Sequence, residues 1–166
     1  MPSAPRTLDE LIAIDSLSQL KARYFRFMDT KQRDLLEALY TPDAVLDARD
    51  DGPAMASLGF PAPPADALLF RTAPGIRQAV SAALEGVRTV HHGHMGEFEI
   101  LGPDRIKAIW AVQDIIRYPA GAPTPIKGFD GFGHYENANV LRVRDASSSV
   151  VDLPLGRVRV LEMAQP

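Results

Sequence analysis

The chain has 166 residues, a formal net charge of −3 and no cysteine. This length suits one domain over residues 1–166, and the missing cysteines exclude disulfides and thiolate zinc sites and fit the reducing cytoplasm. The acidic balance, without any run of Lys or Arg, argues against nucleic acid as a partner, and no apolar stretch is long enough to predict a membrane span.

Apolar residues at helical spacing predict two helices near the start of the chain. The first covers residues 7–28, with Thr7 as its N-cap and acidic residues in its first turn. The second covers residues 31–40, with leucines on one side. Pro42 ends it, because the residue before a proline resists the α conformation.

Residues 49–73 show no period and are rich in glycine and proline. A loop of this length in a compact domain is usually functional or disordered. We therefore interpret the segment as a lid or rim over a pocket, with a solvated excursion as the alternative. A third helix is predicted to open at Pro74, a favoured first-turn residue, and to end at Gly86.

The second half of the chain favours strands. Four segments carry β-branched and aromatic residues between turn signals, at residues 90–101, 106–118, 132–143 and 150–161. Helices followed by consecutive strands predict an α+β fold with an antiparallel sheet.

One carboxylate lies on an apolar face of this predicted sheet. Alternation places Asp114 on the same side of its strand as Trp110 and Ile116. A carboxylate there is costly unless it is paired or hydrogen-bonded, so Asp114 is a candidate functional group. The alternative is a buried carboxylate that caps a loop or pairs with an arginine.

His91, His92 and His94 lie in the preceding strand. Histidine titrates near neutral pH and often serves as a catalytic base. Strict alternation puts His92 and His94 on the core face, whereas a bulge at Gly93 or Gly96 would turn His91 inward instead. The pattern leaves both alternatives open. Two histidines alone do not complete a metal motif, so no metal site is expected.

Tyr135 and Asn137 share one face of a later strand. There they are candidates to bind a polar ligand, or else to satisfy backbone groups at a sheet edge. The glycine-rich run that precedes them leads into a strand rather than a helix, which argues against a phosphate-binding loop. No serine or cysteine nucleophile motif supports acyl-enzyme chemistry.

Several segments together resemble SnoaL-like domains of the nuclear-transport-factor-like superfamily. The segments are LKARYFRFMDTK at residues 20–31, LYTPDAV at 39–45, TVHHGHM at 89–95, WAVQD at 110–114 and GFGHY at 131–135. The resemblance spans residues 8–143. It implies a cone-shaped barrel in which N-terminal helices pack in a strongly curved antiparallel sheet, with a pocket at the open end.

The dehydratase branch of these domains fits best, and it implies catalytic roles for Tyr24, Asp29, His91 and Asp114. This favours His91 over His92. On a helical wheel Tyr24 and Asp29 are about 140° apart. Both can therefore reach one pocket only if the first helix ends or bends near Asp29.

Relatives of such domains include scytalone dehydratase, a bile-acid dehydratase, polyketide cyclases and ketosteroid isomerase, so fold analogy alone names no reaction. The leading hypothesis is acid–base catalysis without metal or cofactor on a small, apolar, cyclic hydroxy-carbonyl compound, with dehydration as the favoured outcome. Substrate contacts are expected from Tyr40, Trp110, Tyr135 and Asn137.

Three alternatives use the same fold. They are an isomerase or cyclase, a ligand-binding or accessory protein, and an oligomeric structural subunit. A homo-oligomer, either dimer or trimer, is expected in each case, because the outer face of a curved sheet usually needs covering.

Overall fold

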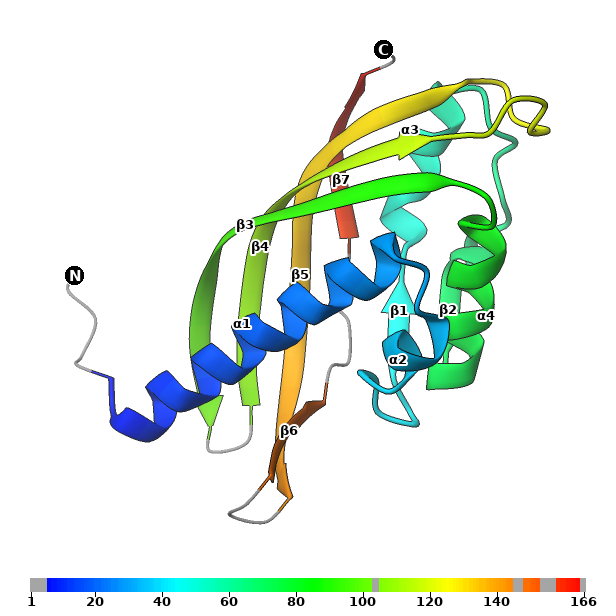
Figure 1. Ribbon diagram of the computed structural model, residues 1–166. Helices are drawn as coiled ribbons and strands as arrows, with labels where there is room; N and C mark the ends of the chain where they lie inside the picture. The colour runs from blue at the N-terminus through cyan, green and yellow to red at the C-terminus, as the bar shows by residue number, and fades with distance from the viewer. Residues whose placement is uncertain (1–5, 103–104, 145–147, 153–157, 165–166) are drawn as a thin grey trace.

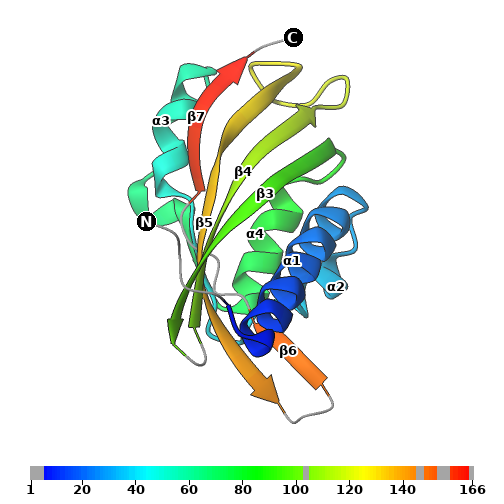
Figure 2. The ribbon, with the colours of Figure 1, turned by 90° about the vertical axis from the view of Figure 1, so that its left-hand side faces the viewer.

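A long helix, α1 (Leu8–Asp29), lies against a curved antiparallel sheet in the computed structural model of this chain (Figure 1). The structure describes residues 6–102, 105–144, 148–152 and 158–164, with side chains up to residue 136 except at residue 65. The strands bend over the helices, and α1 and α4 (Ala73–Ala83) lie on the same side of the sheet (Figure 2). The predicted α+β class with an antiparallel sheet is confirmed.

The first helix begins and ends where its sequence provides caps. Thr7 accepts a hydrogen bond from the Glu10 backbone while the Glu10 carboxylate bonds back to Thr7, which forms a capping box. The helix ends at Asp29, and Lys31 then takes a φ of 59°. That left-handed residue stops the helix within one residue of the predicted end. The required helix end near Asp29 is therefore present.

The segment between α1 and α4 has more regular structure than the sequence predicts. Its second helix is only five residues long, because the left-handed turn at Lys31 delays its start. Residues 49–73, interpreted as a lid or rim loop, hold short helices and a strand. In chain order the elements are α2 (Arg33–Glu37), β1 (Val45–Asp47), a 3-10 helix (Arg49–Asp51), α3 (Gly52–Ser57), a second 3-10 helix (Ala65–Leu68) and β2 (Leu69–Arg71), which pairs with β1.

The main sheet runs β3-β4-β5-β6, and β7 pairs with the other half of the same edge of β5. The prediction of one strand at 150–161 was wrong, because two short strands share the long β5, with Pro154 and Gly156 between them in the sequence. The strands are β3 (Arg88–Gly102), β4 (Arg105–Arg117), β5 (Gly128–Arg144), β6 (Ser148–Asp152) and β7 (Val158–Ala164).

The expected barrel is not closed. Over the described residues β3 pairs with β4 alone, so one edge of the sheet stays open. The core lies between α1 and the inner face of β4, where Leu17 and Leu20 pack with Ile106 and Ala108. Removal of such side chains from water stabilises the fold by roughly 1.5–3 kcal/mol for each large one.

Candidate functional site

A bulge in β3 decides which histidine faces the core. Gly93 pairs with Val112 and Gly96 pairs with Trp110, so β3 has one extra residue between these two positions. The bulge reverses the alternation toward the start of the strand. The His91 side chain is 5% exposed, whereas His92 and His94 are exposed. Strict alternation without a bulge was therefore wrong here, and the alternative that turns His91 inward is confirmed.

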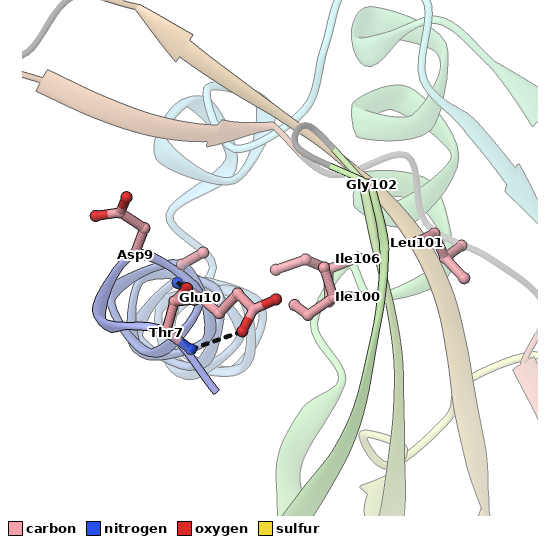
Figure 3. Close-up of a pocket in the computed structure, with 8 residues that line it drawn as sticks. Thr7, Asp9, Glu10, Ile100, Leu101, Gly102 and Ile106 are labelled. Atoms are coloured by element: carbon pink, nitrogen blue, oxygen red, sulfur yellow. Dashed lines mark hydrogen bonds between the residues drawn. The ribbon is translucent and has the colours of Figure 1, made fainter. Parts of the chain in front are cut away.

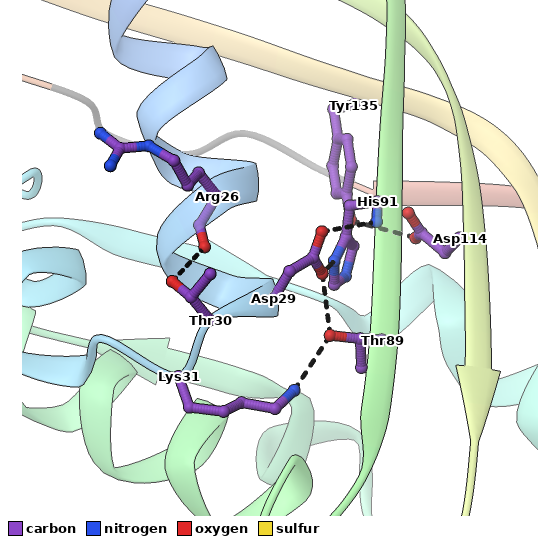
Figure 4. A network of polar contacts seen from close by, with 8 residues as sticks. All are labelled: Arg26, Asp29, Thr30, Lys31, Thr89, His91, Asp114 and Tyr135. Carbon is purple, nitrogen blue, oxygen red and sulfur yellow. Dashed lines mark hydrogen bonds and ion pairs between the residues drawn. The ribbon is translucent and has the colours of Figure 1, made fainter.

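His91 is held at two points by the last residue of α1. Its Nδ1 lies 2.6 Å from Asp29 Oδ1, and its backbone N–H donates to Asp29 Oδ2 at 3.0 Å. The Thr89 hydroxyl donates to Asp29 Oδ1 at 2.8 Å, and Lys31 Nζ donates to that hydroxyl at 2.9 Å (Figure 4). The helix end and the strand are therefore joined by one hydrogen-bonded network.

These contacts keep Asp29 ionised. Burial raises the pKa of Asp29, but the hydrogen bonds from the His91 side chain and backbone, and from Thr89, outweigh burial and bring the pKa below its ordinary value. A carboxylate at Nδ1 selects the tautomer with its proton on that nitrogen. The imidazole Nε2 is then the atom that can accept a proton.

Asp114 lies on β4 directly opposite His91. Figure 4 shows the imidazole between the carboxyl groups of Asp29 and Asp114. The Tyr135 hydroxyl donates to Asp114 Oδ2 at 3.2 Å, while Asp114 Oδ1 is buried and accepts no hydrogen bond from the described residues. Burial raises the pKa of Asp114 above its ordinary value, against the opposing influence of His91, Tyr135 and Lys21.

A cavity of about 260 Å³ opens beside this network. Its described wall is largely apolar, and the polar side chains of that part are three tyrosines and two aspartates. The polar lining residues are Tyr24, Asp51, Asp114, Tyr118 and Tyr135; the apolar ones include Leu46, Met55, Val80, Leu84, Val112, Ile116 and Phe129. An apolar cavity with a few converging polar groups is the usual form of a small-molecule site.

A larger hollow, of about 600 Å³, lies between the start of α1 and the end of the β3–β4 hairpin (Figure 3). Its wall includes Glu10, whose carboxylate is bound to the Thr7 backbone in the capping box. That carboxylate stabilises the start of α1 and is already bonded there. The smaller cavity is the better candidate site because Asp114 and three tyrosines converge on it.

The residues predicted from the sequence are only partly brought together. Tyr24, Asp114 and Tyr135 line the cavity, whereas Asp29 and His91 are not among its lining residues, although His91 pairs with Asp114 on the neighbouring strand. The other expected substrate contacts are elsewhere: Tyr40 borders a hollow beside α2 and α4, Trp110 borders a groove on the other side of α1, and the side chain of Asn137 lies outside the described residues.

Sequence reasoning missed a buried lysine. Lys21 is 2% exposed, and its Nζ lies 4.0 Å from the ring centre of Tyr135 and 4.6 Å from that of Tyr24. Burial lowers the pKa of Lys21 to about 7, although Asp114 acts in the opposite direction. The missed signal is helical spacing, because Lys21 is four residues from Leu17 and three from Tyr24, on the apolar face of α1.

Sequence reasoning also missed Asp51, which lies within the glycine- and proline-rich segment and lines the cavity. Such a segment has no period from which the direction of a side chain could be predicted.

The described residues contain neither a cluster suited to a metal ion nor a helix suited to a membrane. Over that part of the chain, no cluster of three or more histidine or carboxylate side chains suits a metal ion. Among the described helices, none has the length and apolar character to cross a membrane.

Solved structures with the same fold cover nearly the whole chain. A hexachlorocyclohexane dehydrochlorinase, LinA type 2, has a TM-score of 0.73 at 15% identity, over 96% of this chain and 92% of that one. LinA type 3 from Novosphingobium barchaimii has a TM-score of 0.71 at 13% identity, over 96% and 93%. A candidate scytalone dehydratase from Novosphingobium aromaticivorans has a TM-score of 0.72 at 14% identity, over 95% and 90%.

At these identities the structural likeness shows the fold alone. The search of curated proteins found no match. The model of the SnoaL-like domain matches residues 9–146. With most of its length matched by that model, the chain belongs to the family of SnoaL-like domains.

Proposed function

We propose that this protein is an acid–base enzyme, independent of metal or cofactor, that eliminates water from a small cyclic hydroxy-carbonyl compound. One observation carries the proposal: the Asp29 carboxylate binds both Nδ1 and the backbone N–H of His91, beside a largely apolar cavity. A base held in this way has a fixed tautomer and a fixed ring orientation.

The reaction begins at His91, which pairs with the lining residue Asp114, so the substrate carbon reaches His91 past Asp114. The His91 Nε2 takes a proton from the carbon next to the substrate carbonyl, and the resulting imidazolium is stabilised by Asp29. Burial raises the pKa of Tyr24, so its hydroxyl keeps its proton and can donate a hydrogen bond to the carbonyl oxygen. Expulsion of the hydroxyl from the neighbouring carbon then gives the double bond.

The fold neighbours support an elimination. Dehydrochlorinase and dehydratase are both names of reactions that remove HX from adjacent carbons, and proteins with these names share the fold over more than nine-tenths of the chain. An isomerase or a cyclase would use the same base without loss of a leaving group. The mass of the product distinguishes the two outcomes.

The test compares two neighbouring histidines. The purified protein is screened against cyclic hydroxy-ketones and hydroxylated steroids, with loss of the mass of water as the signal. His91→Ala should reduce turnover by roughly 10²–10⁴-fold, whereas His92→Ala, on the exposed face of the same strand, should retain it. Unchanged turnover in a folded His91→Ala variant would refute the assignment. His91→Gln is the substitute if the alanine variant does not fold.

A second candidate function is ligand binding without chemistry, which the predominantly apolar wall of the cavity favours. Ala48 lines the cavity, so Ala48→Phe should block binding of the panel compounds. A binding protein without chemistry is indicated by three results together. Wild type and His91→Ala bind a compound equally, Ala48→Phe does not bind it, and wild type never changes the mass of that compound.

We also propose that the chain forms a homo-oligomer through the outer face of the sheet. Val90 lies on the face opposite His91 and is 45% exposed, which leaves apolar surface there to cover. Light scattering of the purified protein gives the molar mass, and a monomer at all concentrations would contradict the proposal.

A further inference from the structure

Asp51 occupies the N-cap position of a helix, but its side chain does not cap that helix. It ends the 3-10 helix Arg49–Asp51 and occupies the N-cap of α3, where aspartate usually accepts a hydrogen bond from the helix backbone. Its side chain makes no such bond and lines the cavity instead. The Asp51 Oδ1 atom is buried and accepts no hydrogen bond from the described residues.

The surroundings of Asp51 favour its protonated form. Burial raises the pKa of Asp51 to about 7, and the carboxylates of Asp114, Asp50 and Asp47 add to the rise. Tyr24 of α1 and Tyr135 of β5 line the same cavity as neutral phenols. The strand β7 borders the 3-10 helix as well, and its sequence contributes Arg159 and Glu162.

The two carboxyl groups of the cavity therefore differ in role. Asp114 accepts a hydrogen bond from Tyr135, and both His91 and Lys21 favour its ionised form. Among the described side chains, neither a cation nor a hydrogen bond opposes the rise in the pKa of Asp51. When two carboxyl groups share a cavity, the one without cation or donor is the one that keeps the proton.

We propose that Asp51 is the proton donor to the leaving oxygen of the substrate. This rests on the proposed function, in which His91 is the base. His91 Nε2 takes the proton of the C–H bond, and the electron pair of that bond forms the C=C bond. The C–O bond breaks, and the Asp51 O–H proton passes to the departing oxygen to give water. Asp51 ends as a carboxylate and His91 as an imidazolium, and solvent restores both.

The side chains of the cavity wall also indicate the charge of the substrate. The described lining residues provide two carboxyl groups and three phenols but no lysine, arginine or histidine. A substrate carboxylate would face Asp114 with no cationic side chain in the described wall to compensate it. The substrate is therefore a neutral ring compound, whose leaving hydroxyl contacts Asp51.

A first measurement needs no substrate. The carboxyl carbon signal of Asp51, in protein labelled with ¹³C at aspartate and assigned through Asp51→Asn, should titrate near pH 7. Asp50→Asn is the matched control, since Asp50 is the adjacent aspartate and does not line the cavity. It should keep the Asp51 signal in the spectrum and lower its titration midpoint only by the loss of the Asp50 charge. Titration of Asp51 below about pH 5, near the ordinary range for aspartate, would overturn the proposal.

A second measurement separates proton donation from proton abstraction. 3-Hydroxycyclohexanone reports loss of water, and cyclohexanone in D₂O reports exchange at the carbon next to the carbonyl, which needs only the base. Asp51→Asn should slow water loss by about 10²-fold or more and leave exchange nearly unchanged. Asp50→Asn should retain both, and His91→Ala should lose both.

The possible outcomes distinguish the role of Asp51 from the role of His91 and from the proposed function. Equal loss of both reactions in Asp51→Asn, or loss of neither, would overturn the role of Asp51 while leaving that of His91. Exchange without water loss in the wild-type protein would do the same. If wild type catalyses neither reaction, the proposed function itself fails.

Discussion

Asp29 Oδ1 lies 2.6 Å from His91 Nδ1, and Asp29 Oδ2 accepts the backbone N–H of the same residue. The carboxylate thus fixes the ring and its strand together. Asp29→Asn replaces one acceptor oxygen by a donor, so the imidazole loses its preferred tautomer. We expect a fall in turnover of roughly 10²–10⁴-fold, measured on the compound that gives water loss. Asp15→Asn, at an exposed position of the same helix, should be neutral.

The same carboxylate makes the stability of the protein depend on pH. The pKa of Asp29 is below its ordinary value of 3.8 in the folded state, so in acid the unfolded chain binds the proton first. The contribution of Asp29 is therefore complete above the unfolded pKa and is lost as the pH falls through the folded one. Urea unfolding between about pH 5 and 2 should show a weaker acid dependence in Asp29→Asn than in wild type. An equal slope in the two proteins would contradict this linkage.

The bulge that turns His91 inward depends on close packing at a glycine. A Cβ on Gly96 would lie 2.7 Å from both Phe98 Cζ and Trp110 Nε1, and these two rings pack edge to face. Gly96→Ala should therefore destabilise the fold by about 1–3 kcal/mol, measured as the free energy of unfolding in urea. Gly131→Ala is the control, since this glycine also lies in a strand and its Cβ would meet Phe129 at an ordinary 3.6 Å. Equal stability of the two variants would show that the rings move aside at no cost.

This bulge also marks the limit of what the sequence predicts. Alternation alone identified Asp114, because β4 has no extra residue between Ile106 and Ile116 and its side chains alternate between the two faces of the sheet without interruption. It could not choose between His91 and His92, because the extra residue depends on how Gly96 packs against Phe98 of its own strand and Trp110 of β4. The resemblance to SnoaL-like domains favoured His91, the histidine whose side chain is buried, for reasons that periodicity does not contain.

Other features were beyond the sequence for different reasons. The last predicted strand is divided because its two parts, β6 and β7, pair with separate halves of β5. Asp51 follows no periodic pattern. Lys21 does lie on the apolar face of α1, but a lysine at such a position usually extends its charged end to solvent. Here four aromatic rings surround its Nζ at 4.0 to 5.2 Å.

Lys21 makes a second, opposite contribution to the pH dependence of stability. Its pKa falls from 10.5 to about 7 on folding, because burial disfavours the ammonium more than Asp114 and the rings favour it. Between these two values the unfolded chain holds a proton that the folded chain has released, so stability should rise as the pH rises. At 1.4 kcal/mol for each unit of pKa, the rise is of the order of 3–5 kcal/mol.

Lys21→Met gives an unbranched side chain one atom shorter and without the charge, so this rise should be absent in the variant, which should be more stable than wild type at pH 7 and below. Urea unfolding at intervals from about pH 6 to 10 measures the difference. Lys127→Met, at an exposed lysine, should keep the slope of wild type. If Lys21→Met shows the wild-type slope, or is less stable than wild type at pH 6, the ammonium is stabilised by its aromatic and acidic neighbours more than burial disfavours it.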